Sequence, residues 1–317
     1  MKTYVIGHLK PDTDSVVAAM SLAALYQGAD CFGYQDVIPA ITEEVNNETK
    51  FLLDKFELSA PNVLTATQLQ TDDQVVLVDH NEANQRLIDL PEKQIVEIVD
   101  HHKANLNFNQ PIFLTFKPWG SVNTIIAHMM QKNNFTPDSK LAALMLAAIL
   151  SDTVGFKSAT CTPKDRDVAA WLAGLANIDD VDAFTLEIFK AKSDVSKLSC
   201  EEIVKNDYKI FDFAGSKVMI DQLETVEQDT ILADKKDCLL EAMAKVKKDL
   251  GVEHIFVVIT DILKLNSKLL VLDESGAAVA EQAFGGQVTK QVLDIGARLS
   301  RKKEIAPPIE AIFGASK

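Results

Sequence analysis

Three short apolar runs, each followed by histidine or acidic side chains, restrict what this sequence can fold into. The runs are residues 4–6, 74–78 and 95–99, and they are followed by His8, by Asp79-His80 and by Asp100-His101-His102. Each run is too short for an ordinary helix, and stretches with helix-like spacing separate them, so the pattern predicts a parallel α/β sheet buried on both faces. In open sheets of this kind ligands bind beyond the carboxyl ends of the strands, which is where all three motifs fall.

The side chains in these motifs have the character of metal ligands. A lone Asp-x-Asp is usually a solvated turn, and His8 with Asp12 could be a capped turn before a helix, but the recurrence of Asp-His favours a shared metal site. Imidazole and carboxylate donors suit Mn, Co or Fe better than Ca, and the absence of cysteine from this ligand set makes a structural zinc site less favoured. The candidate ligands are His8, Asp12, Asp14, Asp79, His101 and Asp152. They are too many for one small cation and suit two ions that share a bridging carboxylate.

Length and charge restrict the domain organisation and the partners. A chain of 317 residues favours two domains, and we expect residues 1–190, a linker at 191–197 and a smaller α+β domain at 198–317. The second domain is expected to contain a hairpin at 209–220, a helix at 234–250 and a last helix around 290–299.

The net charge of −14 argues against a nucleic-acid partner. No signal peptide or membrane span is visible, so we expect a cytoplasmic protein with no membrane partner. The four cysteines are far apart, and we interpret them as reduced thiols.

The ordered motifs resemble one enzyme family. Gly7-His8-x-x-Pro11-Asp12-Thr13-Asp14, Val78-Asp79-His80-Asn81-Glu82, Val99-Asp100-His101-His102, Ser151-Asp152 and Ser300-Arg301-Lys302-Lys303 resemble the manganese-dependent, family II inorganic pyrophosphatases of the DHH phosphoesterase superfamily. The resemblance covers essentially the whole chain. It implies an N-terminal DHH domain that binds metal, a DHH-associated C-terminal domain that binds substrate, an active site between them, and a homodimer.

The resemblance also implies residue roles. His8 and Asp12 would bind one Mn²⁺, Asp14, His101 and Asp152 the other, and Asp79 would bridge both, with Co²⁺ as a possible substitute. A metal-bridged hydroxide would attack pyrophosphate that arrives with Mg²⁺. Substrate would be held by His102, Lys209, Arg301 and Lys302, although Lys205 is a close alternative to Lys209. Asp100 would orient the histidine pair, and His80 would be a neutral neighbour of the ligands.

Two other functions are compatible with the sequence. Another DHH phosphoesterase would act on polyphosphate ends, oligonucleotides or nucleoside phosphates, and a non-catalytic alternative is a metal- or nucleotide-sensing module. The three basic residues within Ser300–Lys303 could also complement the dipole at the C-terminus of a helix. The short gap between His102 and Asp152 leaves no room for a regulatory insert and favours a plain hydrolase.

Overall fold

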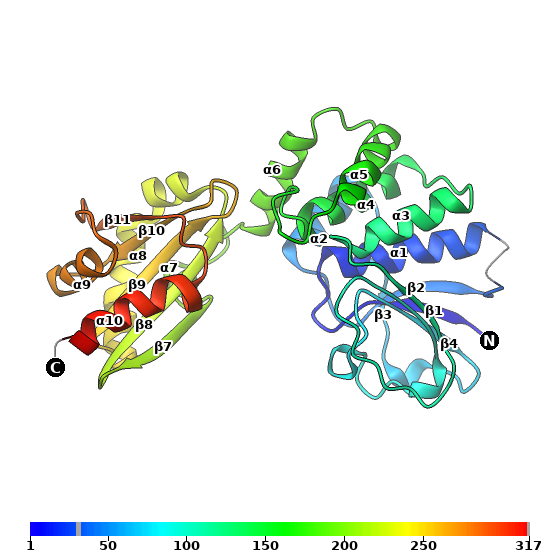
Figure 1. The fold of residues 1–317 in the computed structure, drawn as a ribbon, viewed down its shortest axis with the longest axis horizontal. Coiled ribbons are helices and arrows are strands. Elements are labelled where there is room, and N and C mark those ends of the chain that lie inside the picture. Colours follow the sequence, from blue (N-terminus) through cyan, green and yellow to red (C-terminus); the bar gives the residue numbers. More distant parts are fainter. Residues whose placement is uncertain (30–32, 316–317) are drawn as a thin grey trace. The chain divides into compact units, whose positions relative to one another are not determined.

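The computed structural model describes residues 1–29 and 33–315, which form two compact units, Met1–Ala191 and Lys192–Lys317. The first unit contains a six-stranded parallel sheet of strand order β3-β2-β1-β4-β5-β6 (Figure 1). The second contains a five-stranded mixed sheet of order β11-β10-β9-β8-β7. The predicted fold class, a parallel α/β domain followed by a smaller α+β domain, is confirmed.

In the N-terminal unit the strands of the sheet are short, and the central ones are apolar. The strands are β1 (Thr3–Ile6), β2 (Val37–Ile41), β3 (Asn62–Val63), β4 (Gln74–Val78), β5 (Ile95–Asp100) and β6 (Phe113–Phe116). The helices are α1 (Thr13–Gly28), α2 (Asn47–Lys55), α3 (Val122–Lys132), α4 (Ser139–Asp152), α5 (Pro163–Ala176) and α6 (Val181–Lys192).

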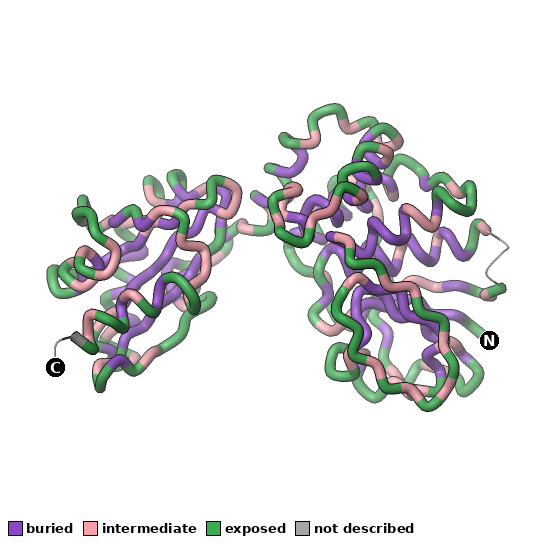
Figure 2. Tube along the Cα trace, viewed as in Figure 1, coloured by how far each residue is buried: buried purple, intermediate pink, exposed green. Residues whose placement is uncertain are grey.

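Both faces of this sheet are covered. Side chains of α1, α3 and α4 pack on one face around Val76 and Val99, and residues from loops, including Leu64 and Leu87, pack on the other around Ile6 and Leu77. The central strands are accordingly buried along their length (Figure 2). This explains why their sequences are continuous apolar runs and do not alternate.

The turn from β1 into α1 depends on a glycine. A Cβ atom at Gly7 would lie 1.9 Å from Ser15 Oγ, so no other residue fits there without a shift. Ser15 Oγ in turn accepts a hydrogen bond from the His8 backbone N–H at 3.0 Å. Asp12 is the N-cap of α1 and accepts the Ser15 N–H at 2.9 Å. The predicted strand, loop and helix are confirmed, and Asp12 does cap the helix.

The C-terminal unit has helices on both faces of its sheet. Its strands are β7 (Tyr208–Phe213), β8 (Ser216–Thr225), β9 (His254–Asp261), β10 (Asn266–Val271) and β11 (Val292–Gly296), and its helices are α7 (Cys200–Val204), α8 (Gln228–Leu250), α9 (Glu274–Phe284) and α10 (Ala306–Ala315). One cluster joins α7 and α8 to the sheet through Ile203 and Met243, and another includes Ala280 of α9 and Ile309 of α10.

The predicted last helix at residues 290–299 is wrong. This segment contains strand β11, in which Leu293 and Ile295 are buried while Asp294 between them is exposed, the alternation of a strand. Lys290 and Gln291 have φ angles of 50° and 65°, which are incompatible with a helix. The chain then passes through a π-helical turn, Arg301–Ile305, into α10. The basic residues therefore precede a helix, where positive charge opposes its dipole, and the helix-dipole explanation for them is wrong.

The interpretation of all four cysteines as reduced thiols is also wrong. Cys200 of α7 and Cys238 of α8 form a disulfide across 38 residues of sequence, whereas Cys161 is free. The two cysteines lie far apart in sequence and meet only because α7 packs on α8, so spacing alone did not reveal the pair. Disulfides are uncommon in reducing compartments, so this bond bears directly on the cytoplasmic location, which stays a prediction.

Reduction of this disulfide is expected to destabilise the C-terminal unit. Closing a loop of 38 residues removes entropy from the unfolded chain, which corresponds to roughly 3–4 kcal/mol in the free energy of unfolding. Denaturant unfolding with and without dithiothreitol measures the difference, and Cys200→Ser should reproduce the effect of reduction. Cys161→Ser is the matched control and should unfold as the wild type does; equal stability of Cys200→Ser and wild type without reductant would contradict the prediction.

Candidate metal centre

Three adjacent parallel strands bring the predicted ligands to one edge of the N-terminal sheet. β1, β4 and β5 are neighbours in the sheet order, and His8, Asp79 and His101 each follow the end of one of them. Asp79 has a φ of 63°, a left-handed conformation that is uncommon outside glycine, and its N–H donates to Val99 O at 3.0 Å. The chain thus turns sharply after β4 and places a buried carboxylate at the centre of the edge.

Two groups of candidate ligands share this carboxylate. In the first, His8 Nε2 lies 3.4 Å from Asp79 Oδ2 and 3.7 Å from Asp12 Oδ1. In the second, His101 Nε2 lies 3.5 Å from Asp152 Oδ2 and 4.0 Å from Asp14 Oδ2. His101 Nε2 is also 3.2 Å from Asp79 Oδ1. The two oxygens of Asp79 therefore face different histidines, as a carboxylate that bridges two cations would require.

The histidine rings are oriented so that Nε2 faces the carboxylates. His8 Nδ1 lies 2.8 Å from Leu9 O, and His101 Nδ1 lies 2.9 Å from Trp119 O. When Nδ1 carries the proton and donates it to these carbonyls, Nε2 presents a lone pair to the cluster. His101 Nε2 and Asp79 Oδ1 are buried and have no hydrogen-bond partner among the described residues. Once the ring has lost its proton, a nitrogen lone pair and a carboxylate oxygen that face each other in this way fit a shared cation.

The cluster is electrostatically unfavourable by itself. Burial alone would lower the pKa of His8, but the carboxylates of Asp12 and Asp79 outweigh it and raise this pKa to about 11. The pKa of His101 likewise rises to about 10 beside Asp79, Asp14 and Asp152, against the effect of burial. Burial and the neighbouring carboxylates raise the pKa of Asp152 to about 9. Divalent cations would let these carboxylates coexist in their charged form.

Asp14 is held by the start of α3, which the sequence did not reveal. Asp14 Oδ1 accepts hydrogen bonds from Ser121 Oγ at 2.5 Å and Asn123 Nδ2 at 2.8 Å, and Oδ2 accepts the Val122 N–H at 2.8 Å. Burial raises the pKa of Asp14 to about 6. Ser121 was recognisable as a helix N-cap, but its second role depends on contact with a residue 107 positions earlier.

Asp100 and Asn81 fix the geometry around the histidine pair. Asp100 Oδ1 accepts the N–H of His101 at 2.7 Å and lies 2.9 Å from His102 Nδ1, and Oδ2 accepts from Asn81 Nδ2 at 2.6 Å. Asp100 is fully buried, yet its hydrogen bonds to His102 and Asn81 lower its pKa to about 2. Nothing in the sequence links Asn81 to Asp100, because these side chains, 19 residues apart, meet only when β4 and β5 pair.

His80 lies beside the ligands but in none of the potential ligand groups of the described residues. Its Nδ1 lies 2.8 Å from Val78 O, and its ring is edge-on to that of His8 at 6.3 Å. Burial lowers the pKa of His80 to about 4, so the ring is neutral at neutral pH.

A cavity of about 520 Å³ opens beside the second ligand group. It is lined by His101, His102, Lys103, Pro118, Trp119, Gly120, Asp152, Ala159, Thr160 and Thr162. The side chain of His102 is 55% exposed, and its pKa is raised chiefly by the hydrogen bond to Asp100. A protonated imidazole at this position could donate from Nε2 to an anion in the cavity.

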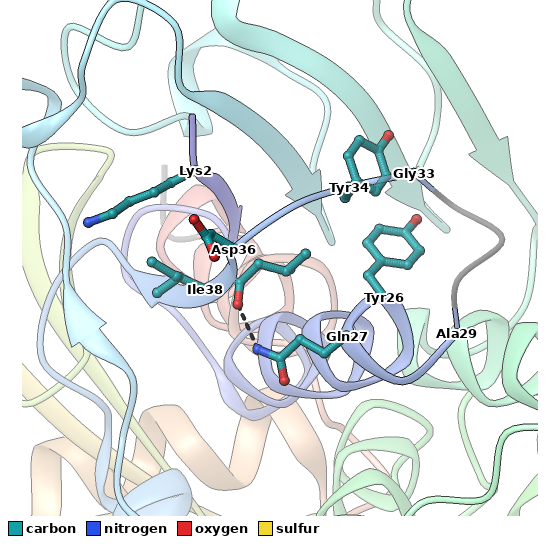
Figure 3. Close-up of a pocket in the computed structure, with 9 residues that line it drawn as sticks. Lys2, Tyr26, Gln27, Ala29, Gly33, Tyr34, Asp36 and Ile38 are labelled. Carbon is teal, nitrogen blue, oxygen red and sulfur yellow. Dashed lines mark hydrogen bonds between the residues drawn. The ribbon is translucent and has the colours of Figure 1, made fainter.

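A second cavity, of about 660 Å³, is unrelated to the ligands (Figure 3). It lies where β1 and β2 begin, at the opposite end of these strands from His8, and is lined among others by Lys2, Tyr26 and Tyr34. Gln27 Nε2 donates to Val37 O at 2.6 Å across its wall.

The predicted substrate residues of the C-terminal unit are Lys209, Arg301 and Lys302, and Arg301 contacts a residue close to Lys209 in sequence. Lys209 is on β7 and Lys302 in the π-helical turn, and both are exposed. Arg301 Nη2 donates to Asp207 Oδ1 at 2.9 Å, two residues before Lys209. Lys205, the alternative to Lys209, donates to Glu201 at 2.8 Å.

Comparison with known proteins identifies two family domains in this chain. The DHH family N-terminal domain matches residues 2–149, and the DHHA2 domain matches residues 186–312. A manganese-dependent inorganic pyrophosphatase of Methanothrix thermoacetophila is 40% identical over 312 residues, covering 98% of each chain. One from Methanocaldococcus jannaschii is 38% identical over 320 residues, covering 98% of this chain and 99% of the relative.

Solved structures are also similar to this chain. A crystal structure from Methanococcus jannaschii, described as a family II inorganic pyrophosphatase, matches with a TM-score of 0.61 and 36% identity over 98% of this chain and 99% of that one. An exopolyphosphatase-related protein from Bacteroides fragilis, with a TM-score of 0.52 and 14% identity over 99% of this chain and 93% of that one, shares the fold alone. From its two domains and its full-length relatives, this chain belongs to the manganese-dependent, family II inorganic pyrophosphatases of the DHH superfamily.

Proposed function

We propose that this chain hydrolyses inorganic pyrophosphate to two phosphates with two Mn²⁺ ions per subunit. The observation that carries the proposal is the position of Asp79, whose two carboxylate oxygens face the histidines of two separate ligand groups. Two ions that share a carboxylate are the arrangement that many phosphoryl-transfer enzymes use.

The ligand sets divide around Asp79. His8 and Asp12 would hold one ion together with Asp79, and Asp14, His101 and Asp152 would hold the other. Asp79 would also reach this second ion, because its Oδ1 lies 3.2 Å from His101 Nε2. Their nitrogen and oxygen donors suit Mn²⁺, and Co²⁺ is a reasonable substitute. When bound, such ions polarise phosphoryl oxygens and make a water molecule nucleophilic at neutral pH.

The protein's own side chains would bind and orient the substrate. His102, held through Nδ1 by Asp100, can direct a proton on Nε2 toward a phosphate or bridging oxygen. Arg301 offers a planar fork of donors for phosphate oxygens, while Lys302 and Lys209 offer point charges. Together with Mg²⁺ that arrives with pyrophosphate, these groups would stabilise the negative charge that develops on the departing phosphate.

The direct test is phosphate release from pyrophosphate in the presence of added Mn²⁺ or Co²⁺. Polyphosphate and a dinucleotide serve as competing substrates, because both are natural choices for other DHH phosphoesterases. We expect pyrophosphate to be turned over much faster than either. Equal or better turnover of the dinucleotide would overturn the proposed function.

Metal binding is expected to release protons, since the raised pKa values of His8 and His101 leave both rings protonated at neutral pH without metal. Each ring must lose its proton to bind a cation, and so must the Asp152 carboxyl, whose pKa is about 9, so about three protons should be displaced for two ions. Raising the pH therefore removes the competing protons and strengthens Mn²⁺ binding. Calorimetry in buffers of different ionisation enthalpy measures the release, and an affinity independent of pH between about 6 and 8 would contradict the prediction.

We also propose that the chain forms a homodimer through the edge strand β6. Phe113 and Leu114 on this strand are 72% and 49% exposed, and apolar edge strands readily pair with another chain. Two copies related by a two-fold axis would pair their β6 strands in antiparallel fashion. Light scattering should show a dimer for the wild type and a monomer for a Phe113→Glu, Leu114→Lys variant, with metal content unchanged. A wild type that stays monomeric at micromolar concentration would contradict the proposal.

A further inference from the structure

Arg301 is anchored in the structure by a single acidic residue. Its Nη2 donates to Asp207 Oδ1 at 2.9 Å, and its Nη1 donates to the backbone oxygen of the same residue. The Arg301 side chain is only 10% exposed, in contrast to the exposed Lys302 beside it. A guanidinium has five N–H donors, so an arginine held by two of them retains others for a phosphate.

Asp207 is itself held by two consecutive residues of β8. Its N–H donates to Asp221 Oδ1 at 3.1 Å, and its backbone oxygen accepts the Gln222 N–H at 3.2 Å. The side chain of Gln222 accepts the Arg301 N–H at 3.1 Å and donates to Leu299 O at 2.9 Å. The backbones of Asp207 and Arg301 are therefore fixed to the same short piece of β8.

Asp221 is a fully buried carboxyl whose Oδ2 has no hydrogen-bond partner in the part of the chain that the structure describes. Burial raises its pKa to about 7, while the Asp207 N–H and the charge of Arg301 act in the opposite direction. A buried polar group of this kind is costly, and such groups are retained where they support a functional geometry.

We propose that Asp207 is a positioning residue that pre-orients the Arg301 guanidinium for a phosphate oxygen of the substrate, with Asp221 fixing Asp207 from inside the unit. The inference rests on the proposed function of Arg301 in pyrophosphate binding. A free arginine loses rotamer freedom when it binds an anion, whereas an arginine that is already held loses little. The opposite role is also physically distinct: if Asp207 sequestered Arg301 from the substrate, its removal would improve substrate binding.

Steady-state kinetics of Asp207→Ala separates the two roles. Positioning predicts that the KM for pyrophosphate rises by about 2- to 13-fold, the range for losing the pre-organisation of one long side chain, with a smaller change in kcat and unchanged Mn²⁺ content. Asp207→Asn keeps an oxygen acceptor and should lie between Asp207→Ala and wild type. Glu224→Ala, which removes an exposed acid from β8, is the matched control for net charge and should leave KM unchanged.

A double-mutant cycle and a direct measurement of how freely the Arg301 guanidinium rotates complete the test. In an Arg301→Ala background, Asp207→Ala should add no further effect, because the interaction is already lost. The sequence has four arginines, so ¹⁵N-arginine NMR can resolve Arg301, and its guanidinium should rotate slowly in wild type and freely in Asp207→Ala. A fall or no change in KM for Asp207→Ala, or free rotation in wild type, would overturn the positioning role. Failure of the wild type to hydrolyse pyrophosphate would instead overturn the proposed function, and the NMR result would still decide whether Asp207 restrains Arg301.

Discussion

Asp79→Asn is expected to abolish pyrophosphate hydrolysis and to reduce the bound Mn²⁺ together. Asparagine has the same shape but lacks the negative charge, and the two oxygens of this one carboxylate face His8 and His101. The loss in kcat/KM should exceed the roughly 10²- to 10³-fold that removal of a single stabilising donor costs, because two ions are affected at once. Metal analysis of the purified variant, measured alongside its kinetics, checks the prediction.

Asp54→Asn is a suitable control for this experiment. Asp54 is an exposed aspartate of α2 that pairs with Lys50 at 2.9 Å, outside both ligand groups. It should retain full metal content and activity. An Asp79→Asn protein that still bound two Mn²⁺ per chain with wild-type affinity would refute the bridging role.

Arg301→Ala is expected to have the second-largest effect and a different signature. The guanidinium is proposed to bind phosphate oxygens, so its removal should lower kcat/KM by about 10²- to 10³-fold while leaving Mn²⁺ content intact. Arg301→Lys should recover only part of this loss, because an ammonium lacks the planar fork.

Arg298→Ala is the matched control for Arg301. Arg298 lies three residues earlier, stacks over Phe284 at 5.3 Å and has no proposed contact with substrate. Kinetics and metal analysis on both variants should show a loss for Arg301→Ala only. Normal kinetics for Arg301→Ala would remove it from the substrate site.

The ligand cluster could be predicted because each of its parts is encoded locally. The apolar run 74–78 predicts a buried strand, and Asp79 follows directly at its end. Because the ends of parallel strands meet at one edge of a sheet, a common site could be predicted without knowing the strand order. The sequence could not specify the groups that hold these ligands. Asn123 reaches Asp14 across 109 residues, and this contact exists only after α1 and α3 have packed together.

The C-terminal unit was harder to predict for a related reason. Residues 290–299 contain apolar side chains whose spacing fits either a helix or a strand, and pairing of β11 with β10 decides between them. The Cys200–Cys238 bond and the anchoring of Arg301 by Asp207, 94 residues away, are similarly set by tertiary contacts. Local sequence patterns carry no information about such partners.

The hydrogen bonds between Asp14 and the start of α3 would connect the proposed metal binding to the folding of the N-terminal unit. The same carboxylate that faces His101 also holds Ser121 and Val122, so whatever fixes Asp14 also fixes the first turn of a core helix. A ligand that binds only the folded state adds its binding free energy to stability, about 2.7 kcal/mol at a concentration 100 times its dissociation constant. Cellular manganese would then govern how long the enzyme survives as well as how fast it works, and scarcity of the metal would shorten the lifetime of the protein.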